Sequence, residues 1–333
     1  MKAARFLGGG RIELYEAPIP EPGPDEVLVE VHSCALCGTD RAAYRDGSDV
    51  IPGHEVAGTV VAAGTDVTGL DEGARGVVYL VDFCGECPVC KAGSTNMCPK
   101  RRKMYGFTAD GGFAAYEVVR SRCFLPIAEH VPLDEATTLL DFYGTNLHAF
   151  RRAGIPLPQG VGVIGCGPIG LGAILVAKTL GAQRLLGIDV APYRLELAGR
   201  FGAVPIDARR GDAVEAALAD TPGGCDVVIE AAGVTATQRQ AIRLTAPGGR
   251  AVFVAHNREP LEVHTLTDLI ASERTLLGSE YFPIGEFPNT HDLLTSGALD
   301  AQSAVTHRYP LEQIENAFET FWSGASAKVL VQP

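Results

Sequence analysis

Four of the nine cysteines in this 333-residue chain lie in one short stretch, CGECPVCKAGSTNMC. They are Cys84, Cys87, Cys90 and Cys98, with the spacing C-x2-C-x2-C-x7-C. Four thiolates can close a tetrahedron around Zn²⁺, and Gly85 and Gly93 permit the tight turns that this needs. An iron–sulfur cluster uses the same four ligands, and four unligated thiols in a surface loop are the third interpretation. A closed four-sulfur zinc site has no open position for substrate, so we expect this stretch to be structural.

A second group of metal-ligating residue types lies nearer the N-terminus. Cys37 stands in CALCGTD, and His54 and Glu55 stand in IPGHEVAG. A thiolate and an imidazole that leave one coordination position open suit a catalytic zinc. Each residue alone also has an ordinary interpretation: a small buried cysteine, a hydrogen-bonded loop histidine and a solvated glutamate. Taken together, they make a catalytic metal site the prediction to test.

A glycine-rich turn in VIGCGPIG has the spacing G-x-G-x-x-G, formed by Gly165, Gly167 and Gly170. The motif follows an apolar strand pattern and opens a helix pattern, with Pro168 and Ile169 in its first turn. In that context the first glycine allows a tight turn, the second lets the backbone approach a pyrophosphate, and the third allows close helix–strand packing. The helix N-terminus adds a favourable dipole for the phosphates. We therefore predict dinucleotide binding here.

The choice of dinucleotide depends on the end of the next strand. Asp189 lies 19 residues after Gly170, where an acidic residue accepts hydrogen bonds from the adenosine ribose hydroxyls. Its carboxylate repels a 2′-phosphate, so we expect NAD rather than NADP as the cofactor. Arg194 is close enough in sequence to reach the ribose or a phosphate, and we include it among the cofactor-binding residues.

Two kinds of element must position these residues. Short alternating runs dominate the first 150 residues, such as EVLVEVHSC (26–34) and VAGTVVAAG (56–64), and predict a small all-β barrel. From about residue 136 a helical pattern begins, DEATTLLDFYGTNLHAFRRAG. Strands such as GVGVIG (160–165) and RLLGID (184–189) then alternate with helices, which predicts a doubly wound parallel sheet. The tail adds a helix and a last strand, AKVLVQP (327–333).

The overall charge narrows the function classes. The formal net charge of −12 and the lack of a basic run argue against a nucleic-acid partner or an anionic membrane surface. No stretch is apolar enough to serve as a signal peptide or a membrane span, so we expect a cytoplasmic protein. A reducing compartment also favours metal binding over disulfides for the clustered cysteines.

The motifs together resemble the zinc-containing medium-chain dehydrogenase/reductase family, which includes alcohol, sorbitol, threonine and glucose dehydrogenases. The resemblance spans essentially the whole chain and rests on CGTD, GHEVAGTVVAAG, the four-cysteine stretch, DGGFAAYEVV, GCGPIG, DVVIEAAG and AKVLV. It implies an α/β protein with a GroES-like β-barrel catalytic domain, residues 1–148 and 287–333. A Rossmann NAD-binding domain, residues 149–286, would interrupt that domain in sequence, with the active-site zinc in the cleft between them.

The resemblance also assigns roles in the catalytic site. Cys37 and His54 match the first two zinc ligands of the family, and Thr39 matches the hydroxyl that passes the alcohol proton onward. The third ligand is usually a Glu or Cys, and the matching stretch DFYGTNLHA puts Asp141 there, with an arm one methylene shorter. The counterpart of Glu55 binds zinc directly or lies just behind it, so Asp141 and Glu55 both stay open as the third ligand.

One departure from the family pattern bears on the substrate. Many alcohol and polyol dehydrogenases of the family end their proton relay on a His five residues after the first zinc Cys, where this chain has Ala42. The proton must leave through ribose hydroxyls and water, or through Arg41, Tyr44 or Asp46 nearby. Some sugar and aminocyclitol dehydrogenases of the family also lack this His. Its absence here therefore favours a polyhydroxylated substrate.

The expected function is hydride transfer between NAD and a secondary alcohol of a polyol, sugar or cyclitol. A simple alcohol dehydrogenase and a noncatalytic NAD-binding protein are the alternatives. His256 lies at a strand end, where it can reach cofactor or substrate, and Glu280 or Tyr281 can contact substrate or a neighbouring subunit. Family members form homodimers or homotetramers, and we expect one of these.

Overall fold

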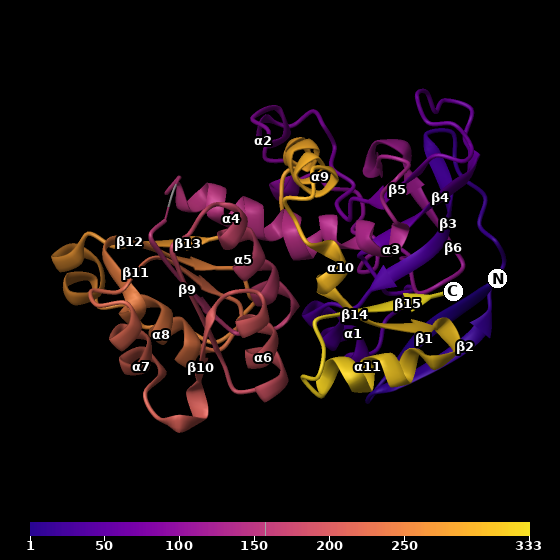
Figure 1. Cartoon of the computed structure of the whole chain (residues 1–333). Helices are drawn as coiled ribbons and strands as arrows, with labels where there is room; N and C mark the ends of the chain where they lie inside the picture. The colour runs from indigo at the N-terminus through magenta and orange to yellow at the C-terminus, as the bar shows by residue number, and fades with distance from the viewer. Residues whose placement is uncertain (157) are drawn as a thin grey trace.

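The computed structural model describes residues 1–156 and 158–333. Figure 1 shows two parts built around separate sheets, with both termini in the same part. One sheet is formed by the middle of the chain, and the other is formed by strands from both ends of the chain. Within the described residues, no helix is both long enough and apolar enough to cross a membrane.

The sheet of the central part has six strands, all parallel, in the order β10-β9-β8-β11-β12-β13. The strands are β8 Gly160–Ile164, β9 Arg184–Asp189, β10 Val204–Asp207, β11 Cys225–Glu230, β12 Thr245–Phe253 and β13 Thr275–Gly278. This order, 3-2-1-4-5-6 in sequence, is that of a Rossmann sheet. The prediction of a doubly wound parallel sheet is confirmed. The four-residue β10 was not predicted, because its sequence VPID contains a proline that weakens the strand pattern.

Helices connect these strands and cover the sheet: α5 Pro168–Thr179, α6 Pro192–Arg200, α7 Ala213–Asp220 and α8 Thr235–Leu244. Both α5 and α6 begin with proline, whose missing N–H costs nothing at a helix start. Most of α5 is buried, with the side chains from Leu171 to Ala177 almost inaccessible to solvent. It therefore holds the preceding glycine-rich turn against the carboxyl ends of the strands.

The sheet of the terminal part has the order β14-β15-β3-β4-β5-β7, with β6 also paired to β3. Its strands are β3 Glu26–Ala35, β4 Val56–Ala63, β5 Arg75–Val78, β6 Tyr116–Arg120, β7 Phe124–Pro126, β14 Val305–Pro310 and β15 Lys328–Gln332. The hairpin β1 Lys2–Gly8 and β2 Arg11–Glu16 lies beside it. Strand β15 pairs antiparallel with the end of β3, so the C-terminal strand returns to the N-terminal sheet (Figure 1).

The helices of this part are short: α1 Arg41–Asp46, α2 Pro88–Lys91, α3 Leu133–Ala136, α9 Phe287–Thr295, α10 Ala301–Ala304 and α11 Ile314–Trp322. The helix α4 Asn146–Ala153 leads into the central part and packs against α5, β11 and β12. One helix from residue 134 to 154 was predicted, and the structure corrects this. The chain passes from α3 through a 3₁₀ turn to a π-helical turn over Asp141–Thr145 before α4 begins. Asn146 donates to the carbonyls of Phe142 and Ile169, which satisfies backbone groups that the irregular helix leaves open.

Candidate active site and metal sites

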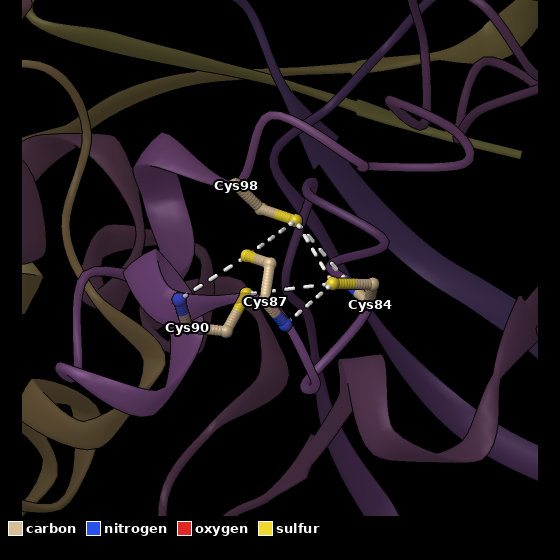
Figure 2. Close-up of side chains that lie close together, drawn as sticks. All are labelled: Cys84, Cys87, Cys90 and Cys98. Atoms are coloured by element: carbon tan, nitrogen blue, oxygen red, sulfur yellow. Dashed lines mark hydrogen bonds between the residues drawn. The ribbon is translucent and has the colours of Figure 1, made fainter.

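The four cysteines of the CGECPVC stretch point at one another (Figure 2). The Sγ–Sγ separations include 3.5 Å for Cys84 and Cys98, 3.9 Å for Cys84 and Cys90, and 4.0 Å for Cys87 and Cys98. Sulfurs about 2.3 Å from a central zinc in a tetrahedron stand about 3.8 Å apart. A disulfide requires about 2.05 Å. The donor set and its spacing therefore fit one four-coordinate metal ion.

The surrounding backbone supports thiolate sulfurs. The amides of Cys84, Cys87 and Cys90 each lie 3.4 Å from the sulfur of another cysteine in the group. Gly85 and Gly93 have φ of 77° and 90°, so the turns are left-handed as expected. Hydrogen bonds from backbone amides lower the pKa of Cys84 to about 6. Desolvation raises the pKa of Cys90 to about 12, so the fourfold thiolate needs a bound cation.

Cys37, His54, Glu55 and Asp141 form the second cluster, with one ligand atom from each lying within 4.8 Å of all the others. Asp141 Oδ2 is 3.3 Å from Cys37 Sγ and 3.4 Å from His54 Nε2. Nitrogen and oxygen ligands about 2.1 Å from zinc in a tetrahedron stand about 3.4 Å apart. Three of these atoms thus have the separations of metal ligands. The four site residues predicted from three separate stretches of sequence are brought together here.

Different elements deliver these side chains. Cys37 follows the end of β3 and starts a 3₁₀ turn over Gly38–Asp40, while His54 and Glu55 immediately precede β4. Asp141 reaches the cluster from the π-helical turn, so the interruption of the predicted helix is what directs this shorter side chain into the site. π-type turns inside helices occur frequently at functional sites.

Asp40 holds the first two ligands in place and was missed by sequence reasoning. Its Oδ2 accepts the backbone N–H of Cys37 at 2.9 Å, and its Oδ1 lies 3.3 Å from Nδ1 of His54. A carboxylate behind a ligating histidine orients the ring and selects the tautomer with Nε2 free. Burial by itself lowers the pKa of His54, but Asp40 and Asp141 outweigh it and raise the pKa well above its usual value. The CGTD motif contained this residue, and its spacing to Cys37 was the available signal.

A buried ion pair lies beside the cluster. Lys328 donates to both carboxylate oxygens of Glu55, and both side chains are fully buried. Burial raises the pKa of Glu55 to about 7 against the opposing charge of Lys328. Lys328 was also missed, and its signal was a single cation in the apolar run AKVLV. Glu55 is therefore engaged with an ammonium, whereas Asp141 faces Cys37 and His54.

The charges of the cluster fit a divalent cation. Asp40, Glu55, Asp141 and Lys328 are all buried. Three carboxylates face one ammonium, so the excess negative charge is offset within the protein only by protonation of His54, which contacts Asp40 and Asp141. Buried charge is costly unless it is paired, and a dication beside Cys37 and His54 would neutralise it.

Two residues face His54 from the open side. Thr39 Oγ1 lies 3.3 Å from Nε2 of His54 and is partly exposed. The ring of Phe107 lies 4.7 Å from the imidazole, centroid to centroid, and is 38% exposed. Phe107 was not predicted, because nothing in its surrounding sequence marks it. Together they place a hydroxyl and an apolar surface beside the metal-ligating atoms.

The polar residues proposed to replace the missing relay His lie elsewhere. The ring of Tyr44 stacks on that of Phe318 at 5.1 Å, Arg41 covers the ring of Trp322, and Asp46 pairs with Arg45 at the surface. None of these contacts involves the metal-ligating residues. His256 and Glu280 do come together, 3.1 Å apart, and the pKa of His256 is raised first by Glu280 and also by the charge of Asp141.

The glycine-rich turn has the geometry that a dinucleotide requires. Gly165 has φ of 89°, and a Cβ there would lie 2.7 Å from the amide nitrogen of Ala232. A Cβ on Gly170 would lie 1.8 Å from the carbonyl oxygen of Gly165. The nearest atom to a Cβ on Gly167 is on the Arg194 side chain, 3.8 Å away. The first and third glycines are needed for packing, and the second leaves the backbone approachable above Pro168 and Ile169.

Asp189 and Arg194 lie at the same turn. The Asp189 carboxylate accepts the backbone amides of Cys166 at 2.6 Å, Val190 at 2.6 Å and Ala191 at 2.8 Å. It is thus fixed at the end of β9 with acceptor capacity remaining on Oδ2. Arg194 Nε is buried and has no hydrogen-bond partner among the described residues. A buried donor without a partner beside an approachable backbone fits a phosphate or ribose ligand.

Known proteins share this arrangement. Residues 23–129 match the family model of the alcohol dehydrogenase GroES-like domain, and residues 168–296 match that of the zinc-binding dehydrogenase. L-threonine 3-dehydrogenase of Symbiobacterium thermophilum is 33% identical over 100% of this chain and 98% of its own length. Sorbitol dehydrogenase of Bacillus subtilis is 31% identical over 100% of this chain and 97% of its own length.

A solved structure agrees with these relatives. A Sinorhizobium meliloti protein described as a zinc-binding dehydrogenase and solved bound to NADP superposes with a TM-score of 0.89. It is 32% identical, and the match covers 100% of this chain and 99% of that one. The predicted family and its two-part fold are confirmed. The chain belongs to the zinc-binding dehydrogenase family, with a GroES-like alcohol dehydrogenase domain joined to a Rossmann sheet.

Proposed function

We propose that this protein is a zinc-dependent dehydrogenase that transfers a hydride between NAD and a secondary alcohol of a polyol, sugar or cyclitol. The observation that carries the proposal is the convergence of Cys37, His54 and Asp141 beside the Thr39 hydroxyl. The three donors are the catalytic zinc ligands. Glu55 lies behind them, because Lys328 occupies its carboxylate. The four cysteines 84, 87, 90 and 98 hold a structural zinc.

When bound, zinc supplies the Lewis acidity that lowers the pKa of an alcohol, and NAD supplies the nicotinamide that accepts a hydride. The chain's own residues transfer the proton, orient the ligands and exclude water. Thr39 accepts the alcohol proton as it donates its own hydroxyl proton toward solvent, since this residue is partly exposed. Asp40 keeps Nε2 of His54 directed at the cluster. Phe107 excludes water from one side of the imidazole.

The substrate and cofactor classes have separate support. The relative that acts on sorbitol and the Ala42 in place of a relay His both favour a polyol. The threonine dehydrogenase relative makes amino alcohols a comparison to include. For the cofactor, the fixed Asp189 carboxylate favours NAD over NADP by repelling a 2′-phosphate, although the Sinorhizobium protein was solved with NADP.

We propose a cytoplasmic homodimer or homotetramer that acts on small molecules, with residues 1–148 and 287–333 as the catalytic domain and 149–286 as the nucleotide-binding domain. None of the nine cysteines forms a disulfide, which suits a reducing compartment. Strand β13 is at the edge of its sheet, and Leu266 and Ile270 are 65% and 67% exposed nearby in sequence. Such an edge and such side chains suit a subunit contact. Light scattering on the purified protein measures the assembly.

The experiment is a substrate panel scored by NADH formation on the zinc-loaded enzyme. Sugars, polyols, aminocyclitols, amino alcohols and simple alcohols are compared, with and without a chelator. Cys37→Ser should abolish activity, whereas Cys123→Ala, at a buried thiol away from both metal clusters, should retain it. Activity that survives full removal of zinc, or a preference for simple alcohols, contradicts the proposal.

A further inference from the structure

Residues 279–284, the return segment, carry the chain from the end of β13 back toward the four-cysteine lobe, here residues 84–98. Figure 1 shows α2, which lies in that lobe, near α9, which begins shortly after the return segment. The return segment contains Tyr281 and Glu280, which the sequence marked as residues that can contact substrate.

Tyr281 has three unusual properties. Its φ is 44°, and it is one of two non-glycine residues with positive φ among the described residues. Its side chain lies in the interior, with 7% of the residue exposed. Its hydroxyl is buried, and the hydroxyl hydrogen has no acceptor among the described residues, although the Leu80 backbone amide acts on the phenol oxygen as a donor. A tyrosine hydroxyl is normally paired when buried, and left-handed backbone at a bulky residue is strained.

The return segment packs against the π-helical turn that carries Asp141, because a Cβ on Gly144 in that turn would lie 2.6 Å from the ring of Phe282. Desolvation raises the pKa of Tyr281 well above its usual value, and the charges of Asp141 and Glu55 raise it further. The ring packs 5.3 Å from that of Tyr79, centroid to centroid. The neighbouring Glu280 pairs with His256, whose pKa also responds to Asp141. An unpaired O–H donor is thus buried within electrostatic reach of the atoms that would bind an alcohol.

The four-cysteine lobe holds this strained segment from the other side. Asn96 Nδ2 donates to the carbonyl of Glu280 at 2.6 Å, so it fixes the peptide group that joins Glu280 to Tyr281. Thr95 Oγ1 accepts the amide of Ile284 at 2.8 Å. Asn96 is 5% exposed and lies two residues before the metal-ligating Cys98. A metal ion held by the four cysteines would therefore stabilise the turn that carries Thr95 and Asn96.

Tyr79 supplies a third hydrogen bond. Its hydroxyl donates to the carbonyl of Phe282 at 2.7 Å and lies 3.3 Å from Thr95 Oγ1. The carbonyls on both sides of Tyr281, those of Glu280 and Phe282, are thus hydrogen-bonded to side chains of the first 100 residues. Strained backbone persists only where its surroundings hold it, and here those surroundings belong to the four-cysteine lobe and β5 with its continuation.

We propose that Tyr281 is a specificity-determining residue whose hydroxyl donates a hydrogen bond to a second hydroxyl group of the substrate, and that Asn96 is its positioning residue. The inference rests on the proposed function, because it concerns the same substrate class. Through Asn96, the four-cysteine lobe would have a role in substrate selection as well as in stability. A polyol has a second hydroxyl that can accept a hydrogen bond from the Tyr281 phenol. A simple alcohol has no such group, so the phenol stays without an acceptor.

The test compares two substrates on the zinc-loaded enzyme: the polyol that wild type oxidises fastest in the panel, and 2-butanol. Tyr281→Phe removes only the hydroxyl, and the loss of an unpaired group leaves the fold intact. We expect kcat/KM for the polyol to fall about tenfold, which is about 1.4 kcal/mol and the size of one hydrogen bond. We expect kcat/KM for 2-butanol to change less than about twofold.

Asn96→Asp tests the positioning role, since it keeps the shape of the side chain and removes the donor to Glu280. It should reproduce the selective loss on the polyol while the zinc content of the enzyme stays unchanged. Met97→Ala is the matched control, because Met97 is the next residue, 54% exposed, and makes no hydrogen bond to the return segment. The affinity of the polyol for the enzyme–NADH complex, measured by calorimetry, gives a readout that does not need turnover and should weaken in both variants.

Equal losses on both substrates would show that Tyr281 and Asn96 act only on the fold, and unchanged polyol kinetics would show that the phenol contacts no substrate. Either result overturns the inference and leaves the proposed function standing. A wild-type enzyme that oxidises only simple alcohols overturns this inference and the polyol assignment together. A wild-type enzyme without any dehydrogenase activity overturns the proposed function itself.

Discussion

The buried pair of Lys328 and Glu55 allows the most demanding test of the site. Both side chains have no exposed surface, and the ammonium contacts both carboxylate oxygens. Lys328→Met keeps a long apolar side chain but leaves Glu55 without its counter-charge. Removing one partner of a buried ion pair costs roughly 3–5 kcal/mol, because the remaining charge is still desolvated. Three buried carboxylates would then face no ammonium at the cluster.

The free energy of unfolding, from urea titrations of the zinc-loaded protein at pH 7, measures this cost. Lys328→Met should lose about 3–5 kcal/mol. The double variant Lys328→Met/Glu55→Gln should recover most of the loss, since it removes both charges, and the cycle gives their coupling energy. Lys100→Met, at an exposed position, is the control and should change stability by less than about 0.5 kcal/mol. A loss in Lys328→Met no larger than in that control, or no recovery in the double variant, would refute the charge argument for this site.

Three further predictions address other parts of the molecule. Cys98→Ser should lower bound zinc from two ions per chain to one, measured by elemental analysis, because three thiolates no longer close the tetrahedron; retention of both ions would contradict a four-sulfur site. Asp189→Asn should raise kcat/KM for NADP relative to NAD by about tenfold or more in steady-state assays, since the like charge opposing a 2′-phosphate is gone. Glu286→Gln should destabilise the protein at pH 7 by about 1 kcal/mol in urea titrations. Burial opposes ionisation of this group, but His148 and Arg151 outweigh it and lower the pKa of Glu286. A lowered folded pKa contributes stability above the unfolded value of about 4.3, and this is lost as pH falls further. The difference between variant and wild type should therefore decline as pH falls below the unfolded pKa and vanish below the lowered folded pKa, and a difference that does not decline in acid would contradict the ionised pair.

The sequence predicted the functional residues correctly where the function requires particular residue types close together in the chain. The four cysteines of the lobe lie within 15 residues, and their spacing alone predicted a common metal. The Gly165–Gly170 turn and Asp189 were predicted from a strand, a turn and a helix that follow one another directly. In these places neighbouring residues decide the backbone geometry, so the ligand that a motif binds can be predicted from the motif alone.

Contacts between distant segments could not be read in this way. Nothing in AKVLV identifies Glu55 as the partner of Lys328, because 273 residues separate them and only the pairing of β15 with β3 brings them together. The π-helical turn that delivers Asp141 was predicted as ordinary helix, since its apolar spacing is helical and its irregularity depends on packing. Tyr44, expected near the proton path, turned out to belong to an aromatic cluster with Phe318.

The amino-acid sequence by itself determined the family, the two classes of metal ligand and the dinucleotide turn, because each depends on residue types at close and regular spacing. Only the tertiary structure decided which carboxylate faces Cys37 and His54, which cation neutralises Glu55, and that Asn96 hydrogen-bonds the backbone beside Tyr281. Those outcomes depend on burial and on the meeting of segments far apart in the chain, and the free energy of a buried charge or hydrogen bond is set by what the whole fold places around it.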